Sequence, residues 1–173
     1  MSTKDGLLGT SRFIVALAVL LNRLFFGAVS IGLPLSWLFS ARIQVMLLQD
    51  APGVDAPTEA MGLRLLMLVG IAMGIGIEIL LSTLRCVLAS ASAGDPFIVV
   101  NARRLQTMGW ALLGLQMLDL PAALIARFFP SLGSAAPEIA FAPGGWLAVL
   151  MLFVLSRVFT AGTAMKDDLE GTV

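Results

Sequence analysis

Histidine is absent from this chain of 173 residues, and cysteine occurs once. Without histidine there is no bis-histidine haem site and no imidazole general base, and most kinds of zinc and copper site are excluded. The single Cys86 cannot form an internal disulfide, and we interpret it as a small apolar residue of a helix. We expect no metal site and no cofactor. No Ser/His/Asp set or phosphate-binding loop indicates an enzyme.

Charged residues are scarce, at 13% of the chain, and 11 basic residues balance 11 acidic ones. A neutral chain gives no electrostatic support for direct nucleic-acid binding, because that binding depends on neutralising phosphates. Apolar residues make up 58% of the sequence, against about 45–50% in ordinary soluble domains. The mean hydropathy is +0.96. This composition is typical of a protein whose main partner is the lipid bilayer.

The apolar residues gather in four stretches separated by short polar breaks. The stretches cover about 13–39, 63–88, 105–126 and 146–165. Each is long enough to cross a hydrocarbon core of about 30 Å as a helix. Helices are required because unpaired backbone groups in lipid cost several kcal/mol each. We therefore predict an all-α integral membrane fold, a four-helix transmembrane bundle that forms a single domain over 1–173.

The orientation in the membrane follows from the lysines and arginines of the short loops. One side carries Lys4, Arg12, Arg103, Arg104 and Lys166, and the other carries Arg42, Arg64 and Arg127. The larger group marks the cytoplasmic side, so we predict that both termini are cytoplasmic (N-in/C-in). A hairpin, about 90–104, and an acidic tail, 166–173, then also lie in the cytoplasm. Two outer loops, about 41–62 and 127–145, are rich in turn-forming residues.

The predicted cytoplasmic hairpin contains a motif that ends one helix and starts the next. The motif is Gly94, Asp95, Pro96 and Phe97, and it is followed by Asn101, Arg103 and Arg104. Glycine ends a helix, aspartate caps the next one, and proline fits a first turn, where its missing N–H does no harm. One interpretation is a helix restart that carries cytoplasmic arginines. The other is a docking surface for a partner protein or for anionic lipid.

The hairpin motif and the residues up to Trp110 resemble the central signature of a bacterial four-helix membrane family, domain of unknown function 2975 (DUF2975). The end of the chain, 158–173, is similar to the C-terminal pattern of that family. Val100 and Arg157 depart from the pattern, since acidic residues are expected there. The resemblance implies a multi-pass protein of the bacterial cytoplasmic (inner) membrane with no established reaction. Some members are encoded beside small helix-turn-helix regulators, which implies a cytoplasmic regulatory partner.

One charged residue lies well inside each apolar stretch, away from its ends. The four are Arg23, Glu78, Asp119 and Arg157. A lone charge inside a membrane costs several kcal/mol, so each should face the bundle interior or water. Arg23, Glu78 and Arg157 share a predicted depth of about 12–15 Å and can form a cluster. Asp119 lies nearer the outer face, among the three outer arginines. These charges form either an ion-pair network that fixes helix pairing or a site for an ion, proton or anionic ligand.

Two glycines of the second stretch, Gly70 and Gly74, form a small-residue face that lets another helix approach closely. This face serves either packing within the chain or contact with a second copy in a homo-oligomer. Because each use requires only a close helix neighbour, the spacing leaves both open.

Two functions from different classes fit these features. The one we favour is a non-enzymatic regulator or scaffold that presents the hairpin and the acidic tail to a cytoplasmic partner. A solvent-exposed Phe97 would favour it. The alternative is a small transporter or ion-permeation unit that uses Glu78 and Asp119. A polar cavity reaching Glu78 would favour transport.

Overall fold

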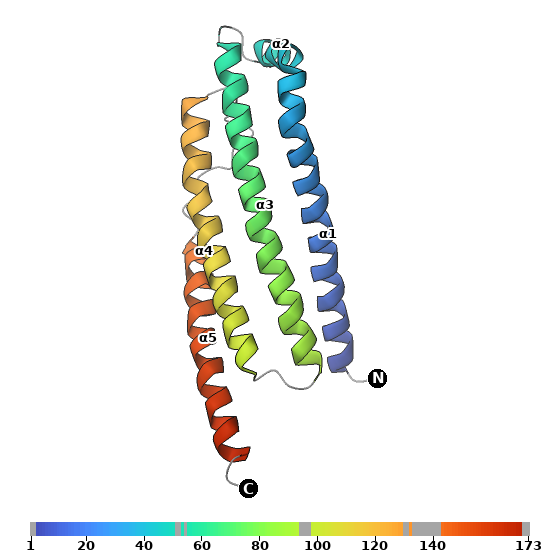
Figure 1. The fold of residues 1–173 in the computed structure, drawn as a ribbon, viewed down its shortest axis with the longest axis vertical. Coiled ribbons are helices and arrows are strands. Elements are labelled where there is room, and N and C mark those ends of the chain that lie inside the picture. Colours follow the sequence, from blue (N-terminus) through green and yellow to red (C-terminus); the bar gives the residue numbers. More distant parts are fainter. Residues whose placement is uncertain are drawn as a thin grey trace. The chain divides into compact units, whose positions relative to one another are not determined.

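The computed structural model describes residues 3–50, 53, 55–93, 98–129, 132 and 143–170 of the chain. Nearly all of these residues are helical. The helices are α1 (Thr3–Leu38), α2 (Ser40–Asp50), α3 (Ala56–Ser92), α4 (Val99–Phe128) and α5 (Pro143–Glu170), as Figure 1 shows. The predicted all-α fold is confirmed.

Four of these helices are long and apolar enough to cross a membrane. The spanning segments are Gly9–Leu38, Ala56–Ser92, Val99–Phe128 and Pro143–Met165. Large apolar side chains lie open on their surfaces, including Leu24 at 62% and Leu150 at 60% exposure. In water such surface would be unfavourable by about 25 cal/mol per Å², whereas lipid tails cover it without that penalty. The chain is therefore a multi-pass membrane protein built as a helical bundle.

The second spanning helix begins at Ala56, seven residues before the predicted start at Leu63. Asp55 caps this start. Its carboxylate accepts a hydrogen bond from the hydroxyl of Thr58, and its carbonyl accepts one from the backbone N–H of Glu59 at 3.0 Å. An aspartate before the first turn is a favourable N-cap because it pairs donors that the helix leaves open.

The predicted outer loop 41–62 is mostly helical, so the expectation of turns was wrong over much of it. Besides the first turns of α3, it contains nearly all of α2, which has 11 residues. Ser40–Asp50 has no glycine or proline, so no residue in it strongly opposes a helix. Gly53 does adopt a turn conformation, with a φ of 97° that favours glycine.

Backbone packing divides the chain into two compact units, each drawn from several helices. The first comprises Met1–Asn22, Gly76–Gly114 and Ala142–Val173. The second comprises Arg23–Ile75 and Leu115–Phe141. Because α1, α3 and α4 each contribute to both units, neither unit is continuous in sequence.

In the second unit, α1 and α3 pack in antiparallel fashion through small residues. A Cβ atom added to Gly74 would lie 2.9 Å from Cδ2 of Phe26, so only glycine fits there without a shift. One turn earlier in α3, a Cβ at Gly70 would lie 3.8 Å from Cγ1 of Val29, an ordinary contact. Gly74 thus serves packing within the chain, as small residues between membrane helices commonly do.

In the first unit, α4 and α5 also run antiparallel. The hydroxyl of Ser156 donates a hydrogen bond to the carbonyl of Ala102 at 2.8 Å, and both residues are buried. Further along, Phe153 packs over Gly109, where an added Cβ would lie 3.2 Å from the ring. The Ser156 hydroxyl and Gly109 together fix which faces of α4 and α5 meet.

Candidate functional site

Polar side chains join the last turns of α3 to the first turns of α4. Asn101 Nδ2 donates a hydrogen bond to Ser90 Oγ at 2.7 Å, and Ser90 Oγ donates to the carbonyl of Val87 at 2.9 Å. Arg104 Nη1 donates to Asn101 Oδ1 at 2.9 Å and to the carbonyl of Cys86 at 3.2 Å. We call Ser90, Asn101 and Arg104 the junction network.

The junction network is buried at its centre. Asn101 is 0% exposed, so its amide needs partners inside the protein, and the network supplies them on both nitrogen and oxygen. Arg103, by contrast, is exposed, so the two adjacent arginines have different surroundings. The motif from Gly94 to Phe97 lies outside the described residues, as do the side chains of the acidic tail. The expectations placed on them stay predictions.

Among the four intramembrane charges, Glu78 has a defined contact with a neighbouring helix. Asn22 Nδ2 of α1 donates a hydrogen bond to Glu78 Oε2 at 3.3 Å. Asn22 is buried and Glu78 is half-buried, both within the first unit. Arg157 belongs to the same unit, whereas Arg23 belongs to the second. The predicted cluster of these charges stays a prediction.

The second unit holds Asp119, which is half-buried in α4, and Arg64, one of its expected partners. Arg64 is engaged with α1 instead. Its Nη2 donates to the carbonyl of Ser36 at 3.0 Å, and its Nε donates to the hydroxyl of Ser36 at 3.2 Å. The guanidinium carbon also lies 4.4 Å from the centre of the Trp37 ring, a cation–π contact. Arg64 therefore ties the last turns of α1 to the first turns of α3.

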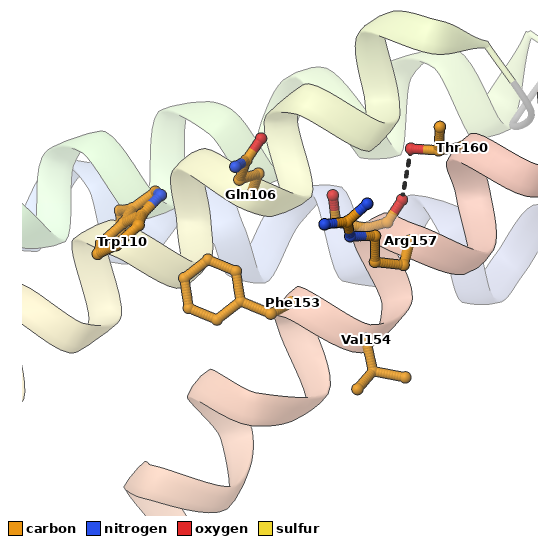
Figure 2. A pocket seen from close by; sticks show the side chains of 7 residues that line it. Gln106, Trp110, Phe153, Val154, Arg157 and Thr160 are labelled. Atoms are coloured by element: carbon orange, nitrogen blue, oxygen red, sulfur yellow. Dashed lines mark hydrogen bonds between the residues drawn. The ribbon is translucent and has the colours of Figure 1, made fainter.

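A polar groove lies between α4 and α5 in the first unit, with a volume of about 560 Å³. Its lining residues are Gln106, Trp110, Phe153, Val154, Ser156, Arg157 and Thr160 (Figure 2). We call it the α4–α5 groove. The guanidinium of Arg157 and the amide of Gln106 are its strongest polar groups, and both side chains are exposed.

The wall of the α4–α5 groove is set by packing and by hydrogen bonds within the protein. Trp110 and Phe153 meet edge to face, with ring centres 5.2 Å apart and planes at 78°. The hydroxyl of Thr160 donates to the carbonyl of Ser156 at 2.9 Å, as the dashed line in Figure 2 marks. These contacts occupy the aromatic rings and the hydroxyl protons. The strongest donors left for a ligand are those of Gln106 and Arg157, beside the indole N–H of Trp110.

Sequence reasoning singled out Arg157 and Trp110 but not the groove that they line together. Gln106 and Trp110 are four residues apart in α4, and Phe153 and Arg157 are four apart in α5. Side chains at this spacing lie on one helix face, so each half of the groove leaves a trace in the sequence. The sequence does not show that these faces of α4 and α5 pack against each other.

No protein-family model, curated protein or solved structure matches this chain. Membership of DUF2975 therefore stays a prediction that rests on the two motifs.

Proposed function

We propose that this chain is a non-enzymatic membrane regulator or scaffold that presents the junction of α3 and α4 to a cytoplasmic regulatory protein. Both termini and this junction would lie on the cytoplasmic side of a bacterial inner membrane. The observation that supports the proposal most is the junction network, because it fixes two spanning helices to each other where the hairpin emerges. DUF2975 is the proposed family, from the motifs alone.

A rigid junction is what a docking surface needs. Binding costs less when the surface is already held in its bound conformation, because fewer side chains lose freedom on association. The buried Asn101 holds the first turn of α4 in place, while Val99 and Val100, at 52% and 50% exposure, remain on its surface. Arg103, two residues after Asn101 in α4, is exposed as well. The first turns of α4 thus offer an apolar and basic surface on a fixed support.

The distribution of arginines supports the proposed orientation. Arg12, Arg85, Arg103 and Arg104 belong to the first unit, and Arg42, Arg64 and Arg127 belong to the second. Cytoplasmic ends of spanning helices carry the excess of basic residues. This distribution supports a cytoplasmic position for the ends of α3 and α4 that carry the junction network.

The orientation is tested by cysteine labelling, since Cys86 is the only natural cysteine. In a Cys86→Ser background, Gly53→Cys and Arg103→Cys are each treated with a membrane-impermeant maleimide in intact spheroplasts. We expect labelling at position 53 alone, and labelling at position 103 only after the membrane is opened. The reverse pattern would show that the orientation is inverted.

The docking proposal is tested by affinity capture of the full chain from detergent-solubilised membranes. Wild type should retain a specific cytoplasmic protein, and Arg103→Glu should lose it because the surface charge is reversed. Asn101→Ala should retain less of it because the support is loosened. Arg42→Glu, which changes an exposed arginine of α2, should retain as much as wild type. Equal loss in Arg42→Glu, or no specific protein with wild type, would contradict the proposal.

A further inference from the structure

We propose that the α4–α5 groove binds the phosphate of an anionic phospholipid headgroup, with Arg157 as the cation that pairs with it. The groove lies on spanning segments of α4 and α5, so it would open toward the membrane. Its ligand would therefore be a component of the membrane. This inference does not depend on the proposed docking function or on the orientation of the chain.

The charges of the groove select an anion. Arg157 contributes a full positive charge, and no acidic residue is present among the described residues that line the groove. An unpaired arginine on a spanning helix is costly, because hydrocarbon cannot solvate its charge. A phosphate oxygen would supply both the counter-charge and the acceptors for the planar guanidinium. The amide of Gln106 adds a further donor on the facing helix.

The depth of Arg157 suits a headgroup. It lies eight residues before Met165, where the spanning segment of α5 ends, which corresponds to about 12 Å along the helix. A long arginine side chain bends toward the interface and shortens that distance, as basic residues in membranes commonly do. Gln106 lies seven residues after Val99, the start of α4. The two donors therefore lie at the same end of the antiparallel pair, within reach of the interface.

The rest of the groove suits the upper part of a lipid. Trp110, which is 60% exposed, and Phe153 form an aromatic wall next to the two donors. A lipid placed with its phosphate on Arg157 would lay the start of an acyl chain along these rings. Tryptophan is a common neighbour of headgroups because its ring combines an apolar body with one N–H donor.

The position of Trp110 provides the test. In the full chain, Trp37→Phe and Trp146→Phe leave Trp110 as the only tryptophan. This protein is placed in phosphatidylcholine vesicles with rising fractions of phosphatidylglycerol brominated in its acyl chains, and quenching of Trp110 reports lipid occupancy. We expect phosphatidylglycerol to be preferred over phosphatidylcholine by about fivefold, the effect of one paired charge near the surface. Arg157→Gln should abolish the preference, and Arg157→Lys should keep part of it.

Two controls and a second variant of the groove make the outcome decisive. Arg12→Gln removes an exposed arginine of the same unit outside the groove and should leave the preference unchanged. Inorganic phosphate added to the vesicles should not compete, because the site is proposed to take its phosphate from lipid. Gln106→Leu should weaken the preference and serves as a second variant if Arg157→Gln loses helicity by circular dichroism. No preference for phosphatidylglycerol in the protein with an intact groove, an equal loss in Arg12→Gln, or competition by inorganic phosphate would each overturn the proposal.

Discussion

Gly62 of α3 is a position at which one methyl group should change the stability of the second unit. Gly62 is buried, and an added Cβ would lie 2.6 Å from Cδ1 and 2.8 Å from Cδ2 of Phe129. Carbon atoms in favourable contact are about 3.5–4.0 Å apart. Because the methyl group would approach both sides of the ring, rotating the ring about its own axis gives no relief. In Gly62→Ala, either Phe129 leaves its place or α3 and the end of α4 separate.

The size of the effect follows from two opposing terms. Overfilling a packed site typically costs about 1–3 kcal/mol. Alanine recovers up to about 1 kcal/mol, because it favours a helix over glycine by that amount. Because the added Cβ would meet three ring atoms closely, the overfilling cost lies in the upper part of that range, about 2–3 kcal/mol, so we expect Gly62→Ala to lower the free energy of unfolding by about 1–2 kcal/mol. Gly70→Ala is the matched control, since its Cβ would lie at an ordinary 3.8 Å from Val29. It should be neutral or stabilising.

The assay is unfolding in mixed micelles with increasing dodecyl sulfate, followed by circular dichroism. Wild type, Gly62→Ala, Phe129→Ala and the double variant form a mutant cycle, which isolates the interaction between the two positions. If the ring causes the cost, Gly62→Ala should cost nothing once Phe129 is alanine. An equal cost in both backgrounds would refute the reasoning, as would a Gly62→Ala protein as stable as Gly70→Ala.

Two further predictions concern the polar contacts between helices. Asn101→Ala should lower the free energy of unfolding by about 1–3 kcal/mol in the same titration, because it removes a fully buried amide and the acceptor of Arg104. If Asn101→Ala lowers the free energy of unfolding no more than a substitution at an exposed position does, the junction network does not stabilise the protein. Arg64→Ala should weaken the contact of α1 with α3, and a cycle with Trp37→Leu should show a coupling of about 0.5–1 kcal/mol. Additive effects of the two changes would show that the cation–π contact contributes nothing.

The spanning helices were predictable because lipid imposes a simple rule on the backbone. Apolar runs long enough to span the membrane must be helical, and all four are. The start of α3 was missed although its signals are present in Asp55, Pro57 and Glu59, an N-cap, a first-turn proline and a first-turn acid. Those residues also suit turns, and hydropathy cannot decide between the two because the residues are mostly not apolar.

The sites were harder to predict, because a sequence of this kind does not show which faces of its helices meet. A water-soluble helix marks its buried face by apolar periodicity, but a spanning helix is apolar all round. Counting residues gave Glu78 and Arg157 a common depth, yet depth contains no angle about the helix axis. Asn22, one residue before Arg23, turned out to be a hydrogen-bond partner of Glu78. Ser90 was not recognised as the partner of Asn101, since hydroxyls are common on spanning helices.

Both proposed sites use residues in the first half of α4. Because they use different faces of that helix, substitutions can test them separately. Asn101 and Arg104 turn toward α3, whereas Gln106 and Trp110 line the groove with α5. Among the described residues, no buried side-chain nitrogen or oxygen lacks a hydrogen-bond partner, so structure alone accounts for the buried polar groups. Arg157 and Gln106 are different, because they are exposed on the surface of spanning helices. A contact that the protein leaves open at such a place is best explained by a ligand from the membrane, and substitutions on the two faces of α4 would distinguish that ligand from a cytoplasmic partner.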